Sequence, residues 1–183
     1  MSEWFETLPS THTRVWQTLG RGVKDRKSPA RNLVLASTGV EGGAEARVVV
    51  LRAARPDQHE IEVHTDRQSA KTAELERDPQ CTALIWDQKA NLQIRLRANA
   101  RLIHGDEAAW SRVPDGARQV YGGTPPPGAV LTDPTEHANA PALERFTRVI
   151  LHIFEVETLH LGRDIHRRAQ FLAPDWQGTW LAP

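Results

Sequence analysis

Hydroxyl and basic side chains gather at the start of one expected helix. A strand over residues 61–65 runs into this helix start, where Ser69 can cap the first turn and Thr65 and Gln68 have the spacing of a capping box. A helix start exposes unpaired backbone N–H groups and the positive end of the macrodipole, and Lys71 adds a full positive charge. These residue types at this spacing predict an anion site that suits a phosphate group.

Two arginines bracket the apolar strand that comes before, at residues 46–52. Arg47 and Arg52 are an odd number of positions apart, so in an extended chain their side chains leave on opposite faces. One of them could reach the anion while the other faces elsewhere. Taken singly, each of these residues would equally suit a helix cap or a solvated strand end, but their clustering favours a bound ligand.

Composition limits the classes of protein that this chain can belong to. Its 183 residues suit one domain, 1–183, with an N-terminal helical region (1–28) and a proline- and glycine-rich loop (121–141). Lys plus Arg and Asp plus Glu both number 23, which argues against nucleic acid or an anionic membrane as a partner. The single Cys81 excludes an internal disulfide, and no apolar run resembles a signal peptide or reaches membrane-spanning length. We therefore expect a soluble, cytoplasmic protein.

Hydrophobic periodicity predicts a mainly β architecture with added helices. The clearest signal is residues 92–102, where apolar side chains alternate with polar ones such as Gln93, Arg95 and Arg97. One face of this strand is expected in the core, while the basic face is either solvated or ligand-binding. The other expected strands are 31–38, 46–52, 61–65, 81–86, 147–156, 169–172 and 176–181, and the expected helices are 4–23 (starting at 9–11), 69–78 and 105–113. Hairpins such as the glycine-containing turn at 39–43 favour an antiparallel barrel over a doubly wound sheet.

Several common chemistries find no support in the sequence. The eight histidines show no H-x-x-x-H or H-E-x-x-H spacing and there is one cysteine, so we expect no metal site. No serine lies in G-x-S-x-G, which argues against a nucleophilic hydrolase, and no G-x-G-x-x-G dinucleotide fingerprint occurs.

Four segments in order resemble the pyridoxamine 5′-phosphate oxidase-like flavoproteins, which have the FMN-binding split-barrel fold. The resemblance runs from about residue 31 to the final Leu-Ala-Pro. Gln93 falls where the family places a glutamine beside the flavin. The other matches are Arg47-Val48-Val49-Val50-Leu51-Arg52 to the family's Arg-x-Val-Leu-Leu-Lys, His64-Thr65-Asp66 to Tyr-Thr-Asn, and Ser69-Ala70-Lys71 to Ser-Arg-Lys.

The resemblance implies an antiparallel split β-barrel that binds FMN at the interface of a homodimer. On this basis Arg47, Ser69 and Lys71 lie near the phosphate, and Gln93 lies along the isoalloxazine ring. The full implied cofactor set is Arg47, Val48, Val49, Val50, Leu51, Arg52, His64, Thr65, Ser69, Lys71, Gln93 and, reaching in from the second copy, Arg168.

Departures from the family pattern concern the substrate more than the flavin. Asp164 stands where the oxidases have a substrate-binding arginine, the tryptophan of that region is absent, and Ala70 and Arg52 replace an arginine and a lysine. The substrate-phosphate residues are not recognisable around 110–123. These departures weaken the expectation that the protein oxidises pyridoxamine phosphate, while the flavin-binding positions are mostly kept.

The sequence thus predicts an FMN-dependent oxidoreductase that acts on a small molecule, in which the flavin supplies the electron chemistry. Arg52, Arg163 and His166 are the candidate substrate contacts. Two alternatives stay open: a flavin-binding carrier or sensor without turnover, and a related split barrel that uses haem or a deazaflavin.

Overall fold

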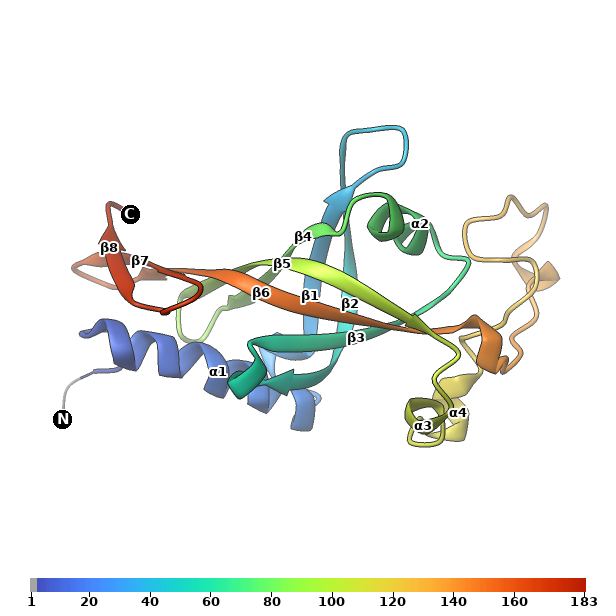
Figure 1. The fold of residues 1–183 in the computed structure, drawn as a ribbon, viewed down its shortest axis with the longest axis horizontal. Coiled ribbons are helices and arrows are strands. Elements are labelled where there is room, and N and C mark those ends of the chain that lie inside the picture. The colour runs from blue at the N-terminus through green and yellow to red at the C-terminus, as the bar shows by residue number, and fades with distance from the viewer. Residues whose placement is uncertain (1–2) are drawn as a thin grey trace.

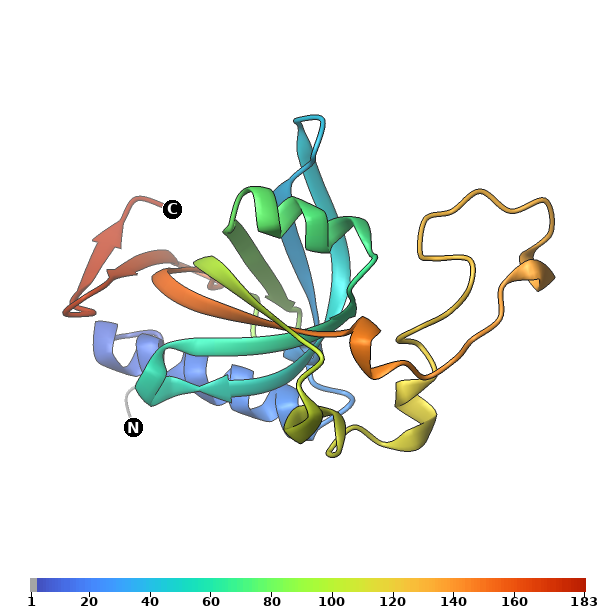
Figure 2. The same cartoon turned by 45° about the vertical axis from the view of Figure 1, so that its right-hand side comes forward.

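The protein is built on one antiparallel sheet that closes on itself, in a computed structural model that describes residues 3–183 (Figures 1 and 2). Its strands are β1 (Asn32–Thr38), β2 (Ala44–Arg55), β3 (Glu60–Asp66), β4 (Gln80–Asp87), β5 (Leu92–His104), β6 (Phe146–Leu161), β7 (His166–Leu172) and β8 (Gly178–Leu181). They follow the order β3-β2-β1-β4-β5-β6-β7-β8. Because β3 also pairs with β6, the first six form a closed barrel, and β7 and β8 extend beyond it. The expected antiparallel barrel is confirmed.

Four α-helices decorate this barrel: α1 (Leu8–Lys24), α2 (Ala70–Arg77), α3 (Glu107–Trp110) and α4 (Asp115–Arg118). Short 3₁₀ turns cover Pro29–Arg31, Pro56–Gln58, Pro134–Glu136 and Leu143–Arg145. The predicted N-terminal helix is confirmed but begins at Leu8, because Thr7 is the N-cap and its hydroxyl accepts a hydrogen bond from the Ser10 N–H. Among residues 3–183, no helix has the length and apolar character needed to cross a bilayer.

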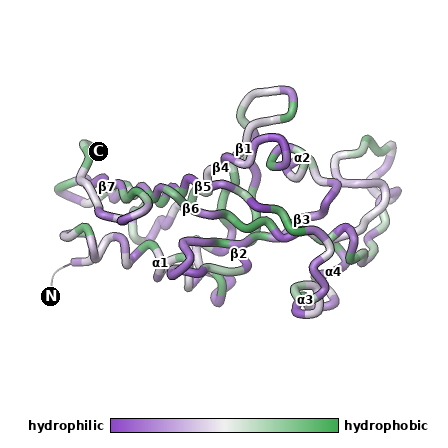
Figure 3. Tube along the Cα trace, viewed as in Figure 1, coloured by the Kyte–Doolittle hydropathy of each residue, from purple (hydrophilic) through white to green (hydrophobic). Residues whose placement is uncertain are grey.

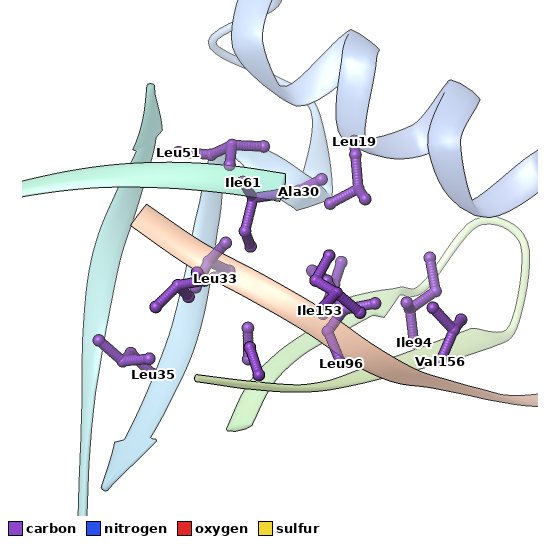
Figure 4. Close-up of a cluster of buried hydrophobic side chains, with 14 of the residues drawn as sticks. Leu19, Ala30, Leu33, Leu35, Leu51, Ile61, Ile94, Leu96, Ile153 and Val156 are labelled. Atoms are coloured by element: carbon purple, nitrogen blue, oxygen red, sulfur yellow. The ribbon is translucent and has the colours of Figure 1, made fainter. Parts of the chain in front are cut away.

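The core lies inside the barrel and under α1. The predicted alternation of β5 is confirmed, because Leu92, Ile94, Leu96 and Ala98 are all fully buried. α1 adds Val15 and Leu19 to the same cluster. Figure 4 shows Leu19 pointing toward buried side chains of the barrel strands. Hydrophobic and hydrophilic residues are accordingly interleaved along the barrel strands in Figure 3. Each large side chain buried in this way stabilises the fold by about 1.5–3 kcal/mol.

The basic face of β5 is paired rather than simply solvated. Arg95 donates to Glu157 at 2.6 Å and Arg97 donates to Glu155 at 3.1 Å. Both carboxylates lie on β6 and are buried. The neighbouring strand therefore neutralises two of the arginines that the sequence left free to bind a ligand.

Several element boundaries differ from those expected. β2 and β6 are longer than predicted, and the expected helix at 105–113 is one turn, α3, followed by a second turn, α4, that was missed. The 121–141 loop has no helix or strand apart from a 3₁₀ turn and one bridge between Thr124 and Ala138, as its glycines and prolines predicted. It projects from the barrel between α4 and β6 (Figure 2).

A cluster of histidine and tryptophan rings joins α1 to two distant turns. His59, between β2 and β3, stacks on Trp176, between β7 and β8, with ring centroids 4.2 Å apart. His12 of α1 stacks on the same indole at 5.9 Å. Burial lowers the pKa of both histidines, and the nearby His59 lowers the pKa of His12 further.

This cluster makes folding sensitive to mild acid. A histidine whose pKa is lower in the folded than in the unfolded state contributes stability above pH 6.5, and that stability is lost as the pH falls below this value. Urea unfolding should therefore show a lower free energy of unfolding at about pH 5.5 than at about pH 7.5. Each histidine can contribute at most about 1.4 kcal/mol to this loss for each pH unit. The loss should shrink in His12→Gln. An unchanged loss in that variant would contradict this role.

Candidate functional site

The predicted anion-binding residues converge at the start of α2. The Thr65 and Ser69 hydroxyls are 2.9 Å apart, and the Lys71 ammonium donates to the Thr65 hydroxyl at 3.1 Å. Burial lowers the pKa of Lys71, and the positive charge of neighbouring Arg47 lowers it further. Lys71 forms no ion pair with any residue between 3 and 183, so its charge is available to a ligand.

The expected capping box is wrong. Asp66, rather than Thr65, accepts the Gln68 N–H, at 2.7 Å. Ser69 is the N-cap residue but its side chain makes no capping hydrogen bond, because its hydroxyl contacts Thr65 and Thr72 instead. Because the Ser69 side chain does not cap the helix, backbone N–H groups in the first turn of α2 can donate to an oxygen atom of a bound ligand.

A buried carboxylate that the sequence analysis missed holds Arg47 beside this cluster. Glu74, whose side chain is 5% exposed, accepts from Arg47 at 2.6 Å and from the Ser37 hydroxyl at 2.6 Å. Arg47 also donates to Ser37. Glu74 follows Lys71 by three residues, a spacing that puts both side chains on one face of the helix. This spacing was the signal in the sequence that could have placed Glu74 beside the anion-binding residues.

Asp66 ties three parts of the chain to the same place. It accepts from the Nε of Arg145 at 2.9 Å and from the N–H of Gly122 at 2.9 Å, in addition to Gln68. Gly122 has a φ of +127°, and a Cβ there would lie 2.6 Å from the Ala140 carbonyl oxygen, so only glycine fits. The base of the 121–141 loop is therefore fixed next to the start of α2.

A cavity of about 260 Å³ lies where β2 and β3 face α3. Glu62 forms its charged floor, accepting from Arg148 at 2.7 and 2.9 Å, from His64 at 2.9 Å and from Arg55. Burial acts to raise the pKa of Glu62, but the bonds from Arg148, His64 and Arg55 outweigh it and hold that pKa far below its usual value.

Two further arginines in this cavity are free to bind a ligand. Arg52 and Arg112 line it but form no ion pair with any part of the chain from residue 3 onward. The Nε of Arg52 is buried without a hydrogen-bond partner among those residues. Burial raises the pKa of the Tyr121 hydroxyl, while the nearby positive charge of Arg52 opposes that rise. Ala109, Val113 and Pro114 supply an apolar wall, so the cavity suits a small anion with an apolar body.

Strand β2 connects the anion cluster to this cavity. Val49 and Leu51 face the core, whereas Val48 is 65% exposed and Val50 is partly buried. Arg47 and Arg52 do point to different places, as their spacing predicted. Within this segment, therefore, only the backbone, Val48 and Val50 are open to a ligand between the two arginines.

The remaining predicted residues lie elsewhere in the same chain. Gln93 is on the outer face of β5, three strands away from Arg47 in the sheet order. On the other side of Gln93, Leu159 of β6 lies between it and Arg168 of β7. Arg163 and His166 lie near the β6–β7 turn. β6 has 16 residues, about 50 Å, so this turn and the cavity beside Arg52 occupy opposite ends of the strand. One chain does not bring the three candidate substrate contacts together.

Comparison with known proteins identifies the family. Residues 13–104 match the model of the pyridoxamine 5′-phosphate oxidase FMN-binding domain. The chain belongs to this family. No curated protein matches it by sequence.

Solved structures share its fold. A pyridoxamine 5′-phosphate oxidase-related FMN-binding protein from Nostoc punctiforme superposes with a TM-score of 0.75 at 20% identity, covering 100% of this chain and 99% of the other. PhzG from Burkholderia lata superposes with a TM-score of 0.71 at 20% identity, covering 96% and 92%. A protein related to general stress protein 26 from Clostridium acetobutylicum gives 0.58 at 10% identity, covering 91% and 94%. The split-barrel fold expected from the sequence is confirmed.

Asp66 should be essential to the stability of this region. Asp66→Ala leaves the largely buried Arg145 guanidinium without its carboxylate, which should cost about 3 kcal/mol in the free energy of unfolding. Chemical denaturation measures this, with Glu41→Ala, an exposed carboxylate in the β1–β2 turn, as the control. Equal small effects of the two substitutions would contradict the role of Asp66.

Proposed function

We propose that this protein is an FMN-dependent oxidoreductase that acts on a small anionic molecule. The observation that carries the proposal is the convergence of Thr65, Ser69 and Lys71 at the start of α2, with Arg47 alongside. Membership of an FMN-binding family supports the choice of flavin.

The donor set at this place fits the phosphate of FMN. An ammonium, a guanidinium, two hydroxyls and the N–H groups of a helix start all favour a dianion through charge-assisted hydrogen bonds. Glu74 removes one unit of positive charge but keeps Arg47 in a fixed orientation. The neighbouring residues of β2 then offer their backbone and Val48 to the flavin ring.

Each part of the chain would have a distinct task. Bound FMN supplies hydride-transfer chemistry at its isoalloxazine ring. Arg52 and Arg112 would bind the anionic group of the substrate, and the apolar wall of the cavity would exclude water from its body. PhzG, which shares the fold, was crystallised with tetrahydrophenazine-1-carboxylic acid, a small carboxylic acid of the kind that such a basic cavity suits.

The separated residues support a homodimer with the cofactor at its interface. Gln93 and Arg168 lie on β5 and β7, away from the start of α2 in the sheet order, and we propose that a second copy supplies them. Arg163 and His166 would likewise approach the substrate from that copy. The outer face of the barrel has the exposed Val48 on β2 and, three strands away in the same row of the sheet, the paired charges of Arg95 and Glu157, which suits such an interface.

A second candidate function is a flavin carrier or sensor without turnover, favoured by Asp164 in the place of the family's substrate arginine. A haem- or deazaflavin-binding split barrel is a third. The visible spectrum of the purified protein separates these cofactors. With flavin bound, peroxide release under air with B6 phosphates and small carboxylic acids tests turnover; flavin without any turnover would favour the carrier.

Removing the Lys71 charge should weaken FMN binding selectively. Lys71→Ala should lower FMN affinity about 10- to 100-fold, because a charge-assisted bond contributes about 1.5–3 kcal/mol, and should leave riboflavin affinity nearly unchanged. Quenching of flavin fluorescence measures both. Lys24→Ala, an exposed lysine at the end of α1, is the matched control. A parallel loss of riboflavin binding would argue for general damage to the site instead.

Charge on the outer face of β2 should disrupt the dimer. Val48→Glu introduces a carboxylate at the proposed interface and should convert dimers to monomers in light scattering at micromolar concentration. Val40→Glu, in the exposed β1–β2 turn, should not. A monomeric unmodified protein, or a dimeric Val48→Glu variant, would refute this interface.

A further inference from the structure

A β-bulge in β2 directs three of its side chains into the cavity beside Arg52. The pairing of β2 with β3 shifts between Leu51 and Ala53, so that Arg52 is an extra residue in the ladder. In a bulge two neighbouring residues oppose one residue of the partner strand, and the local bend changes where their side chains point. Arg52, Ala53 and Arg55 accordingly all line the cavity, although Arg52 and Arg55 are an odd number of positions apart.

Two guanidinium nitrogens on this wall are buried without a hydrogen-bond partner in the described part of the chain. They are the Nε of Arg52 and the Nη1 of Arg55. The other terminal nitrogen of Arg55 donates to Glu62, but Nη1 lies 3.6 Å from a carboxylate oxygen of Glu60, too far for a hydrogen bond. Native structures rarely leave buried donors without an acceptor, so both nitrogens favour a ligand oxygen at this wall.

The segment between α3 and α4 supplies another unpaired guanidinium to the same cavity. Arg112 lines it and forms no ion pair with any residue from 3 to 183. Its neighbours Val113 and Pro114, and Ala109 of α3, give this wall an otherwise apolar surface. Two unpaired positive groups therefore reach the cavity from different elements of the fold, with apolar side chains beside one of them.

The other charges at the cavity floor are already paired. Arg148 donates to Glu62 at 2.7 and 2.9 Å and to Asp106 at 2.6 Å. Arg55 and the ring of His64 occupy the remaining positions on the Glu62 carboxylate, so each of its oxygens has two hydrogen-bond partners. Since the floor has no acceptor to spare, a ligand has to supply negative charge for the two unpaired arginines.

The volume of the cavity limits the size of that ligand. At about 260 Å³ it lies just below the usual range of about 300–1,000 Å³ for small-molecule sites. The part of the ligand between its charged groups is therefore short, about the size of one ring.

From these features we propose that the substrate is a dicarboxylic acid, with one carboxylate on Arg52 and Arg55 and the other on Arg112. This inference rests on the proposed function and narrows its substrate from any small anion to one with two separated negative groups. The two oxygens of one carboxylate can accept from the two unpartnered nitrogens of Arg52 and Arg55. The second carboxylate would pair with Arg112, and the apolar side chains beside it would contact the body of the ligand.

Isothermal titration calorimetry with three single-ring acids tests this proposal, with and without FMN. Isophthalate, which has two separated carboxylates, should bind saturably at one per chain. Benzoate, with one carboxylate, should bind at least about tenfold more weakly. Phenyl phosphate, whose charge lies at one end, should also bind more weakly than isophthalate. Absence of isophthalate binding, equal binding of benzoate, or tighter binding of phenyl phosphate would overturn the proposal.

Matched variants assign the two carboxylates to their arginines. Arg112→Gln should weaken isophthalate binding about tenfold and change benzoate binding less than about twofold, whereas Arg52→Gln should weaken both. Arg21→Gln, an exposed arginine at the end of α1, should change neither. Circular dichroism verifies that each variant is folded. An equal loss of both ligands in Arg112→Gln, or an equal effect of Arg21→Gln, would overturn the assignment.

The same titrations separate this inference from the flavin function. Isophthalate binding by a protein that does not bind FMN would refute the flavin function alone. FMN binding without a preference for isophthalate over benzoate would refute the dicarboxylic acid alone.

Discussion

The pairing of β3 with β6 is the constraint on which the rest of the structure depends. Seven residue pairs, from Glu60 with His152 to Asp66 with Phe146, join the two strands and close the barrel. Without this pairing, the end of β3 would not meet the segment that leads into β6. Because it does, Asp66 forms an ion pair with Arg145 and accepts the N–H of Gly122 at the base of the 121–141 loop. Thr65 likewise lies at the start of α2, within hydrogen-bonding distance of Ser69. The local geometry of the anion cluster thus follows from a long-range strand contact.

Charge is distributed so that the arginines next to the buried carboxylates of the barrel are already paired. Buried Glu62, Glu74 and Glu157 each hold at least one guanidinium, which stabilises the barrel exterior without attracting a ligand. A chain with equal numbers of acidic and basic residues can therefore still present local positive sites. These sites are marked by cations that lack a carboxylate partner in the described chain, such as Lys71 and Arg52.

The sequence predicted those features that depend on local pattern. The alternation in β5, the turn at Gly42 and Gly43, and the helix after Ser69 all follow from periodicity or turn chemistry, and the structure agrees. The sequence pattern could not predict where β2 and β6 end, because the length of each strand depends on how far its partner strands extend. Nor could it foresee Glu74 beside Arg47 or Glu157 beside Arg95, since those contacts join residues far apart in the chain.

The central claim is that side chains and N–H groups at the start of α2 bind the phosphate of FMN. The most direct test is the affinity of the unmodified protein for FMN and for riboflavin, which differ only in that phosphate. The account predicts that FMN binds at least about tenfold more tightly, as charge-assisted bonds to one anion would provide. Equal affinities, or no binding of either flavin, would contradict it.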